Sequence, residues 1–123
     1  MSKLDQYAEN QRQTYSKITQ SLDDAKDAVG PNYEKLRREA TAYAEYVLGN
    51  YFLRNGISER YRRSTLEQLK LLDFGCGVGR VMEAFSELGI SVVDGCDISE
   101  EMQRFARASE LLKKSKFFLS SGY

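Results

Sequence analysis

Apolar positions along this 123-residue chain recur with a helical period at first, and the period changes near residue 69. Before that point, apolar residues return at steps of three and four, which predicts amphipathic helices. After it, short apolar runs that end in glycine alternate with further helical stretches, which indicates strands joined by helices. The pattern therefore divides the chain into a helical N-terminal part and an alternating C-terminal part.

The N-terminal part is predicted to hold three helices. The first covers residues 4–29 and is polar over most of its surface, so we expect it to pack lightly or to act as a lid. Gly30-Pro31 is predicted to end it, because proline cannot continue a helix interior. The second runs from about Asn32 to Phe52 and the third from Ser58 to Gln68. The second helix has the clearest apolar face, made by Tyr33, Leu36, Ala40, Tyr43, Val47 and Tyr51 and widened by Ala44, Leu48 and Phe52.

Aromatic and basic side chains in this part could meet a substrate, but simpler roles are expected for most of them. Tyr43 and Tyr51 lie on the apolar stripe and are predicted to belong mostly to the core, whereas Tyr46 falls off it and is a candidate for lining a pocket. The basic residues of the third helix are expected to form a solvated face rather than an anion site. They are Arg60, Arg62 and Arg63.

The C-terminal part is predicted to alternate strands and helices. Its elements, in order, are strand 69–74, helix 78–88, strand 90–96, helix 99–114 and a strand that opens at Phe117. The first strand is a short apolar run and is expected to be buried on both faces. Ser99 is predicted to cap the helix over residues 99–114. Alternation of this kind implies an α/β fold with a parallel sheet and right-handed crossovers.

Composition narrows the classes of function. Hydrophobic residues make up 41% of the chain and charged residues 29%, which is typical of a soluble globular protein. Lys+Arg and Asp+Glu both number 18, so bulk charge gives no reason to expect a nucleic-acid partner. No segment has the length of apolar sequence that a membrane span or signal peptide needs, so we expect no membrane partner and a cytoplasmic location.

The absence of histidine excludes a Cys/His zinc site and any histidine-based catalytic triad, and no metal is expected. Cys76 and Cys96 both fall near predicted strand ends. They are expected to be buried free thiols of a protein in a reducing compartment.

The most informative chemistry lies where the first predicted strand ends. Glycines at positions 75, 77 and 79 let the backbone turn sharply and approach a ligand closely, unless they serve only a tight turn. The next helix would direct free N–H groups at such a ligand. Asp97 ends the second strand, where a carboxylate either caps a helix or accepts the hydroxyl hydrogens of a ribose. Asp73 could orient the turn or bind a cationic group.

Two nucleoside ligands fit this arrangement to different degrees. A dinucleotide site of the type G-x-G-x-x-G requires a small residue at position 80, where this chain has Arg80. A pyrophosphate also gains little from the nearby carboxylate of Asp73. A sulfonium nucleoside with an amino-acid tail gains from acidic residues, so the sequence favours it over a NAD-type ligand.

Residues 73–80, DFGCGVGR, resemble the first motif of the class I S-adenosylmethionine-dependent methyltransferases, and residues 95–102, GCDISEEM, resemble their second-strand motif. The resemblance covers about residues 69–123. It implies a partial Rossmann-like parallel sheet with strand order 3-2-1, S-adenosylmethionine as the cofactor, and methyl transfer to an unidentified small-molecule acceptor. The implied division is a helical cap or lid over residues 1–64 and a cofactor-binding domain over residues 65–123.

The resemblance also implies a set of cofactor-binding residues. The turn glycines would contact the methionine and ribose portions through their backbone, and Asp97 would bind the ribose hydroxyls. Ile98 would cover the adenine, Met102 would pack beside it unless it belongs to the core, and Asp73 would lie near the methionine ammonium. No catalytic residue is assigned. The full set is Asp73, Gly75, Cys76, Gly77, Gly79, Asp97, Ile98 and Met102.

The family's sheet has more strands than the three predicted here, and this leaves three interpretations open. The chain is a fragment of a longer methyltransferase, a natural half completed by a partner chain or by self-association, or a small binding protein without catalysis. The alternatives to an enzyme are accordingly a non-catalytic module that binds S-adenosylmethionine or S-adenosylhomocysteine, and, less favoured, a NAD-type domain.

Overall fold

The computed structural model of the protein describes residues 3, 5–6, 9–10 and 30–120. The helix predicted over residues 4–29, with its suggested role as a lid, lies outside these residues apart from a few helical positions near its start. The described elements, in order, are helices α2 (Gly30–Arg54) and α3 (Glu59–Gln68), strand β1 (Lys70–Phe74), helix α4 (Arg80–Glu87), strand β2 (Val92–Asp97), helix α5 (Glu100–Arg107), the 3-10 helix η1 (Glu110–Leu112) and strand β3 (Phe117–Leu119).

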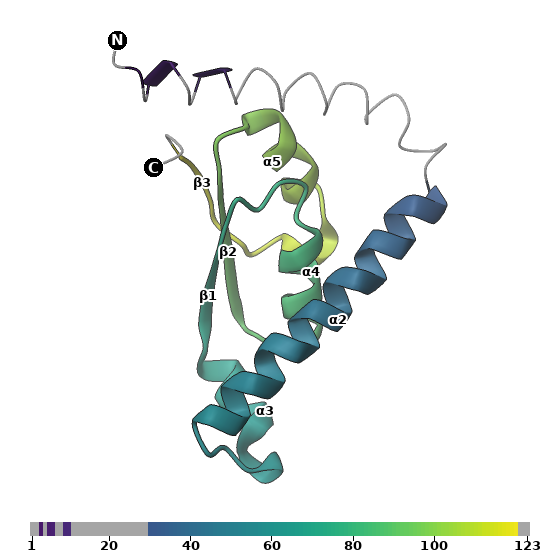
Figure 1. Ribbon diagram of the computed structural model, residues 1–123, viewed down its shortest axis with the longest axis vertical. Coiled ribbons are helices and arrows are strands. Elements are labelled where there is room, and N and C mark those ends of the chain that lie inside the picture. The colour runs from purple at the N-terminus through teal and green to yellow at the C-terminus, as the bar shows by residue number, and fades with distance from the viewer. Residues whose placement is uncertain (1–2, 4, 7–8, 11–29, 121–123) are drawn as a thin grey trace.

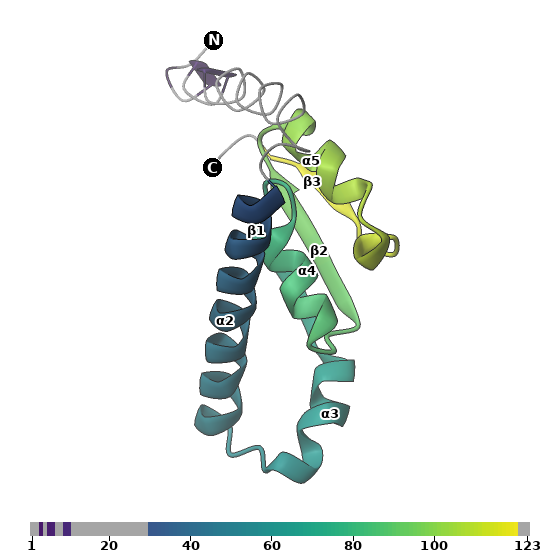
Figure 2. The same ribbon diagram turned by 90° about the vertical axis from the view of Figure 1, so that its right-hand side faces the viewer.

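The predicted α/β class with a parallel sheet is confirmed. The described strands form one three-stranded sheet in the order β1-β2-β3, in which both pairs are parallel and β2 is central. Gly95 of β2 pairs with Asp73 of β1 on one side and with Phe117 of β3 on the other. Helices α4 and α5 lie on the same side of the sheet, and α2 runs across the outer surface of α4 (Figures 1 and 2).

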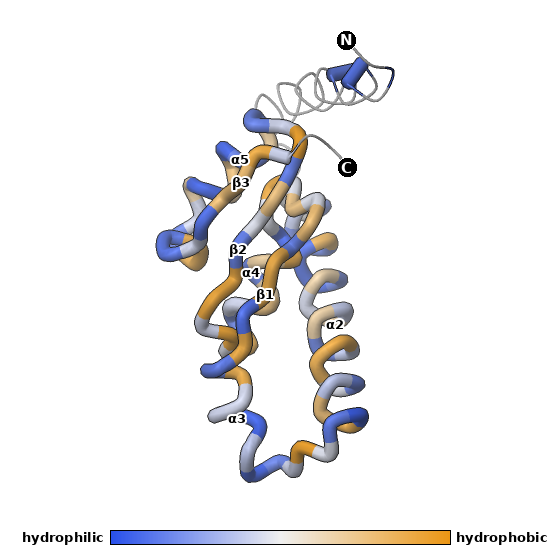
Figure 3. Tube along the Cα trace, turned by 90° about the vertical axis from the view of Figure 1, so that its left-hand side faces the viewer, coloured by the Kyte–Doolittle hydropathy of each residue, from blue (hydrophilic) through white to orange (hydrophobic). Residues whose placement is uncertain are grey.

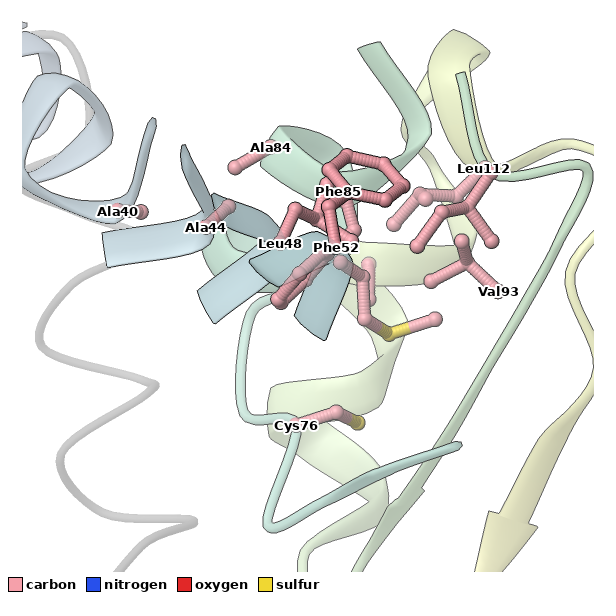
Figure 4. Close-up of a cluster of buried hydrophobic side chains, with 12 residues drawn as sticks. Ala40, Ala44, Leu48, Phe52, Cys76, Ala84, Phe85, Val93 and Leu112 are labelled. Atoms are coloured by element: carbon pink, nitrogen blue, oxygen red, sulfur yellow. The ribbon is translucent and has the colours of Figure 1, made fainter. Parts of the chain in front are cut away.

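The core lies between α2 and the sheet, with α4 in the middle (Figure 4). Small residues of α2 let the two helices approach closely, because Ala44 and Ala84 are both completely buried. Phe85 of α4 fills the space beside them with 4% of its surface exposed, and Val93 supports it from β2. The predicted apolar face of α2 is therefore right in part: its buried members are Ala40, Ala44, Leu48 and Phe52.

The prediction that Tyr43 and Tyr51 belong mostly to the core is wrong. Tyr43 is 56% exposed and Tyr51 is 37% exposed, because α2 turns its narrower alanine and leucine stripe toward α4. The ring of Tyr43 instead covers the edge of Phe85, with ring centroids 6.5 Å apart. Tyr46 is 72% exposed.

Among the described helices, none combines the length and the apolar composition that a membrane-spanning segment requires.

The prediction that β1 is buried on both faces is also wrong. Leu71 packs against the core, but Leu72 and Phe74 point to the opposite face and are 56% and 67% exposed. This follows from the layering, because α2, α4 and α5 all cover one face of the sheet (Figure 1). Figure 3 views the molecule from the strand side, where apolar residues of β1 and β2 colour parts of the tube orange. We call this side the open face and define it by Leu72, Phe74, Val92 and Phe118.

Several element ends differ from the prediction for local reasons. Gly30-Pro31 opens α2, since proline is compatible with the first turn of a helix. Helix α4 begins at Arg80 rather than near Val78, because Gly79 before it is left-handed. Helix α5 ends at Arg107 rather than near Lys114, because the chain becomes extended at Ser109 before η1. The predicted cap at Ser99 is confirmed: its Oγ accepts the N–H of Met102 at 3.2 Å.

Candidate functional site

The glycine turn joins the C-terminal end of β1 to the start of α4, next to the C-terminal end of β2. The carbonyl oxygen of Cys96 accepts two hydrogen bonds from it, from the N–H of Gly75 at 2.7 Å and from that of Cys76 at 2.9 Å. The turn closes through the N–H of Gly79, which donates to the carbonyl of Cys76 at 3.0 Å. The end of β2 therefore holds the turn in place.

All three turn glycines have a positive φ that a side chain would strain, and they differ in what a side chain would meet. Gly79 has φ of +88°, and a Cβ there would stand 2.9 Å from the Cβ of Ala106 on α5. Gly77 has φ of +54° and lies against the terminal methyl group of Met102. At Gly75, by contrast, a Cβ would meet nothing within 4 Å. The turn thus packs on α5 at one end and faces open space at the other, where a ligand can approach its backbone.

Asp97 connects the turn to the start of α5. One carboxylate oxygen accepts the N–H of Gly77 at 2.8 Å, and the other accepts the N–H of Ser99 at 2.9 Å. The side chain is buried, with 9% of the residue exposed. Asp97 therefore has the structural role that a capping residue would have, and each oxygen keeps further lone-pair capacity for a ligand donor.

Asp73 and Asp97 make the site electrostatically negative. The pKa of Asp73 is raised above its ordinary value, first because burial disfavours the charged carboxylate and second because the charge of Asp97 repels it. A cationic group placed between the strand ends would offset both effects, because it would stabilise the charged carboxylates. A pyrophosphate would add to them. The chemistry of these two side chains therefore favours a positively charged ligand.

Cys76 lies in the turn beneath this acidic pair. Burial raises the pKa of its thiol to about 12, and the charges of Asp97 and Asp73 act in the same direction. The thiol is therefore protonated at neutral pH and is a poor nucleophile. Its contribution is packing, because it is 6% exposed and belongs to the hydrophobic core.

The two apolar candidates differ in burial. Ile98 is 9% exposed and follows Asp97 directly. Met102 is half-buried in the first turn of α5, where its side chain reaches Gly77. The structure therefore brings Asp73, Asp97, the turn glycines and Met102 together at the carboxyl end of β1 and β2.

Sequence reasoning missed two residues on which this geometry depends. Gly95 of β2 lies under the turn: a Cβ there would stand 2.6 Å from Sδ of Met82 and 2.9 Å from Sγ of Cys76. Gln103 of α5 is completely buried and donates from Nε2 to the carbonyl of Phe118 at 2.6 Å. A glycine inside a strand was the available signal for the first, because it often marks a close approach of neighbouring atoms. The polar Gln103 within a helix gave no comparable signal.

Comparison with known protein families gives a match in the C-terminal part of the chain. Residues 72–120 match the family described as "Methyltransferase domain", which spans the chain from within β1 to just beyond β3. No curated protein and no solved structure matches the chain. The match covers every residue of the glycine turn and of the Asp97 region.

Proposed function

Residues 72–120 match the methyltransferase domain family, and from this premise we propose that the chain binds S-adenosylmethionine at the glycine turn and transfers its methyl group to a small-molecule acceptor. The observation that carries the proposal is the turn itself, which faces open space at Gly75 and is bonded through Gly77 to the carboxylate of Asp97. Members of this family generally bind that cofactor.

The ribose contact rests on the unused capacity of Asp97. A carboxylate offers about four lone-pair sites, and in this chain the N–H groups of Gly77 and Ser99 take one on each oxygen. The remaining sites can accept the two ribose hydroxyls without breaking either backbone bond. The carboxylate is then fixed in orientation before the ligand arrives, which lowers the entropic cost of binding.

The charge of the ligand supports the same assignment. S-adenosylmethionine carries a sulfonium and an ammonium group, and Asp73 lies where a cation would offset the repulsion from Asp97. We assign the ammonium to Asp73 and the adenine to the surface formed by Ile98 and Met102. In this assignment the backbone of Gly75, Cys76, Gly77 and Gly79 borders the methionine and ribose portions.

The cofactor supplies the chemistry when bound, because its methyl carbon is already activated by the positive sulfur. The protein then has to position the acceptor and exclude water. The N-terminal region, residues 1–64, is proposed to form the cap and residues 65–123 the cofactor-binding domain. Helix α2 is tied to α4 by the Tyr33 hydroxyl, which donates to Oε1 of Glu83 at 3.0 Å, and by Arg37, which pairs with Glu87 at 2.7 Å.

The deciding experiment is calorimetric titration of the chain with S-adenosylhomocysteine and with its 2′,3′-dideoxy analogue. Asp97→Asn should weaken binding of the parent ligand by about 1.5–3 kcal/mol, since it removes charge-assisted hydrogen bonds. The same substitution should change binding of the dideoxy analogue by much less, because that ligand has no hydroxyls to lose. Asp94→Asn is the matched control, because Asp94 lies on the same strand but accepts the N–H of Lys116.

Equal losses for both ligands would show that Asp97 acts only on the fold and would contradict the ribose assignment. Binding of NAD in preference to S-adenosylhomocysteine would contradict the cofactor assignment. Transfer of a labelled methyl group from S-adenosylmethionine to pooled small metabolites tests the catalytic half of the proposal. Binding without any transfer would favour a non-catalytic module.

A further inference from the structure

A cavity of about 580 Å³ lies on the helical side of the molecule, between the N-terminal ends of α2 and α4 and the C-terminal end of α5. Its volume lies within the range of small-molecule sites. Its lining contains none of the residues assigned above to the cofactor. Its large aliphatic and phenyl wall residues are Leu36, Val78, Phe105 and Leu111.

Glu83, the carboxylate in the wall nearest α2, is already satisfied. Oε1 accepts the hydroxyl of Tyr33 at 3.0 Å, and Oε2 accepts the hydroxyl of Ser109 at 2.9 Å. The guanidinium of Arg37 adds a positive charge 3.9 Å from Oε1. The second acid in the lining, Glu110, pairs with Lys113 at 3.1 Å. Neither carboxylate therefore gives the cavity a strong preference for a cation.

Arg80 is the cationic residue in the lining. Unlike the two carboxylates, it has no oppositely charged partner within residues 30–120. Its guanidinium lies 6.0 Å from the centre of the Tyr33 ring. The residue is half-buried and opens α4, where the helix dipole adds further positive potential. A half-buried cation beside apolar walls is complementary to an anion that carries an apolar body.

We propose that this cavity binds a small apolar monocarboxylate, with its hydrocarbon part against Leu36, Phe105 and Leu111 and its carboxylate on the guanidinium of Arg80. This site is separate from the proposed cofactor site. The two sites are neighbours in sequence, because Val78 and Arg80 line the cavity whereas Gly77 and Gly79 are assigned to the cofactor. The inference stands without methyl transfer, because it uses only the cavity and its charges.

Octanoate is a suitable probe, with octanamide and octylamine as the neutral and cationic compounds of matched length. In titration of the cofactor-free full chain, octanoate should bind at least about tenfold more tightly than octanamide, and octylamine should be the weakest. Arg80→Gln should lower octanoate affinity by about tenfold or more and leave octanamide unchanged. Arg60→Gln is the matched control, because Arg60 also stacks on a tyrosine, Tyr61, but lies on α3 away from the cavity.

A second substitution tests the location. Ala108 lines the cavity and is exposed, so Ala108→Leu should fill part of the space and weaken octanoate and octanamide alike. Ala42→Leu adds the same atoms at an exposed position of α2 outside the lining and should have no effect. Thermal unfolding of each variant shows that the fold is retained.

Octanoate affinity that is unchanged in both Arg80→Gln and Ala108→Leu would overturn the proposal. Competition between S-adenosylhomocysteine and octanoate would overturn the assignment to a separate site, whereas retention of octanoate binding at saturating S-adenosylhomocysteine would support it. A chain that binds octanoate but not S-adenosylhomocysteine would contradict the proposed function and leave this inference standing.

Discussion

On the helix-covered face of the sheet, Val93 and Gly95 lie beneath α4, and a Cβ at Gly95 would have no room. On the open face, Leu72 and Phe74 project from β1 with more than half of their surfaces exposed. The strand residues on the two faces are similarly apolar. Their different burial shows that the contribution of an apolar strand residue to folding stability depends on whether helices cover its face of the sheet.

The largest expected effect is a difference in stability between substitutions of two phenylalanines, one on the helix-covered side of the sheet and one on the open face. Phe85→Ala should lower the free energy of unfolding by about 3–5 kcal/mol, because it leaves a cavity beside Val93 and Ala44. Phe74→Ala, at a position 67% exposed, should change it by less than about 1 kcal/mol. Urea denaturation of both variants measures the difference. Similar losses would mean that the open face is covered in solution.

Substitutions at the two ends of the glycine turn should also differ in how much they destabilise the chain, with the larger loss at the packed end. Gly79→Ala should destabilise the chain by about 3 kcal/mol, since the left-handed backbone is strained with a side chain and the new methyl group meets Ala106. Gly75→Ala keeps the backbone strain but meets open space, so about 1–2 kcal/mol is expected. Equal effects in thermal and urea unfolding would show that contact with α5 does not constrain the turn.

A smaller effect is expected where α2 meets the covered side. Tyr33→Phe removes the hydroxyl that donates to Glu83 and should cost about 1 kcal/mol in the free energy of unfolding. Tyr46→Phe is the control, because Tyr46 is on the same helix and 72% exposed. If the two variants unfold alike, the Tyr33–Glu83 bond does not hold α2 to α4.

The smallest expected effect is a change in the pH dependence of stability. The pKa of Asp73 is raised in the folded chain, so the folded state holds this proton more tightly than the unfolded state. Stability from this group is therefore fully present below its ordinary pKa and declines as pH rises through the raised one. Asp73→Asn should remove that decline in urea titrations between pH 3 and 7, whereas Asp94→Asn should retain it. A wild-type decline in the Asp73→Asn variant would contradict the assignment.

Much of the fold could be predicted from the sequence because its signals are local. The order of the elements within residues 30–120, the cap at Ser99 and the position of Asp97 at the end of β2 follow from short patterns, and the structure agrees with them. The exposure of Tyr43 and of Phe74 could not be predicted, because it depends on which neighbouring layer covers each face. Completion of the sheet by a second copy or by a partner chain stays a prediction.

The candidate site shows the same division. The turn glycines and the two carboxylates were identified from spacing and residue type, and the structure brings them together. Their assignment to individual groups of a cofactor stays a prediction. The cavity beside Arg80 could not have been predicted, because its walls come from segments that are distant in sequence: the start of α2, the turn and start of α4, and the chain from α5 to η1.

The contact beneath the turn constrains how the sequence can vary. Gly95, Met82 and Cys76 come from a strand, a helix and a loop, yet a single added carbon at Gly95 would reach both sulfur atoms. These three positions should therefore change together among descendants of this sequence. A larger residue at position 95 would be better tolerated after smaller ones had arisen at positions 76 and 82, so the order of substitutions would matter as well as their identity.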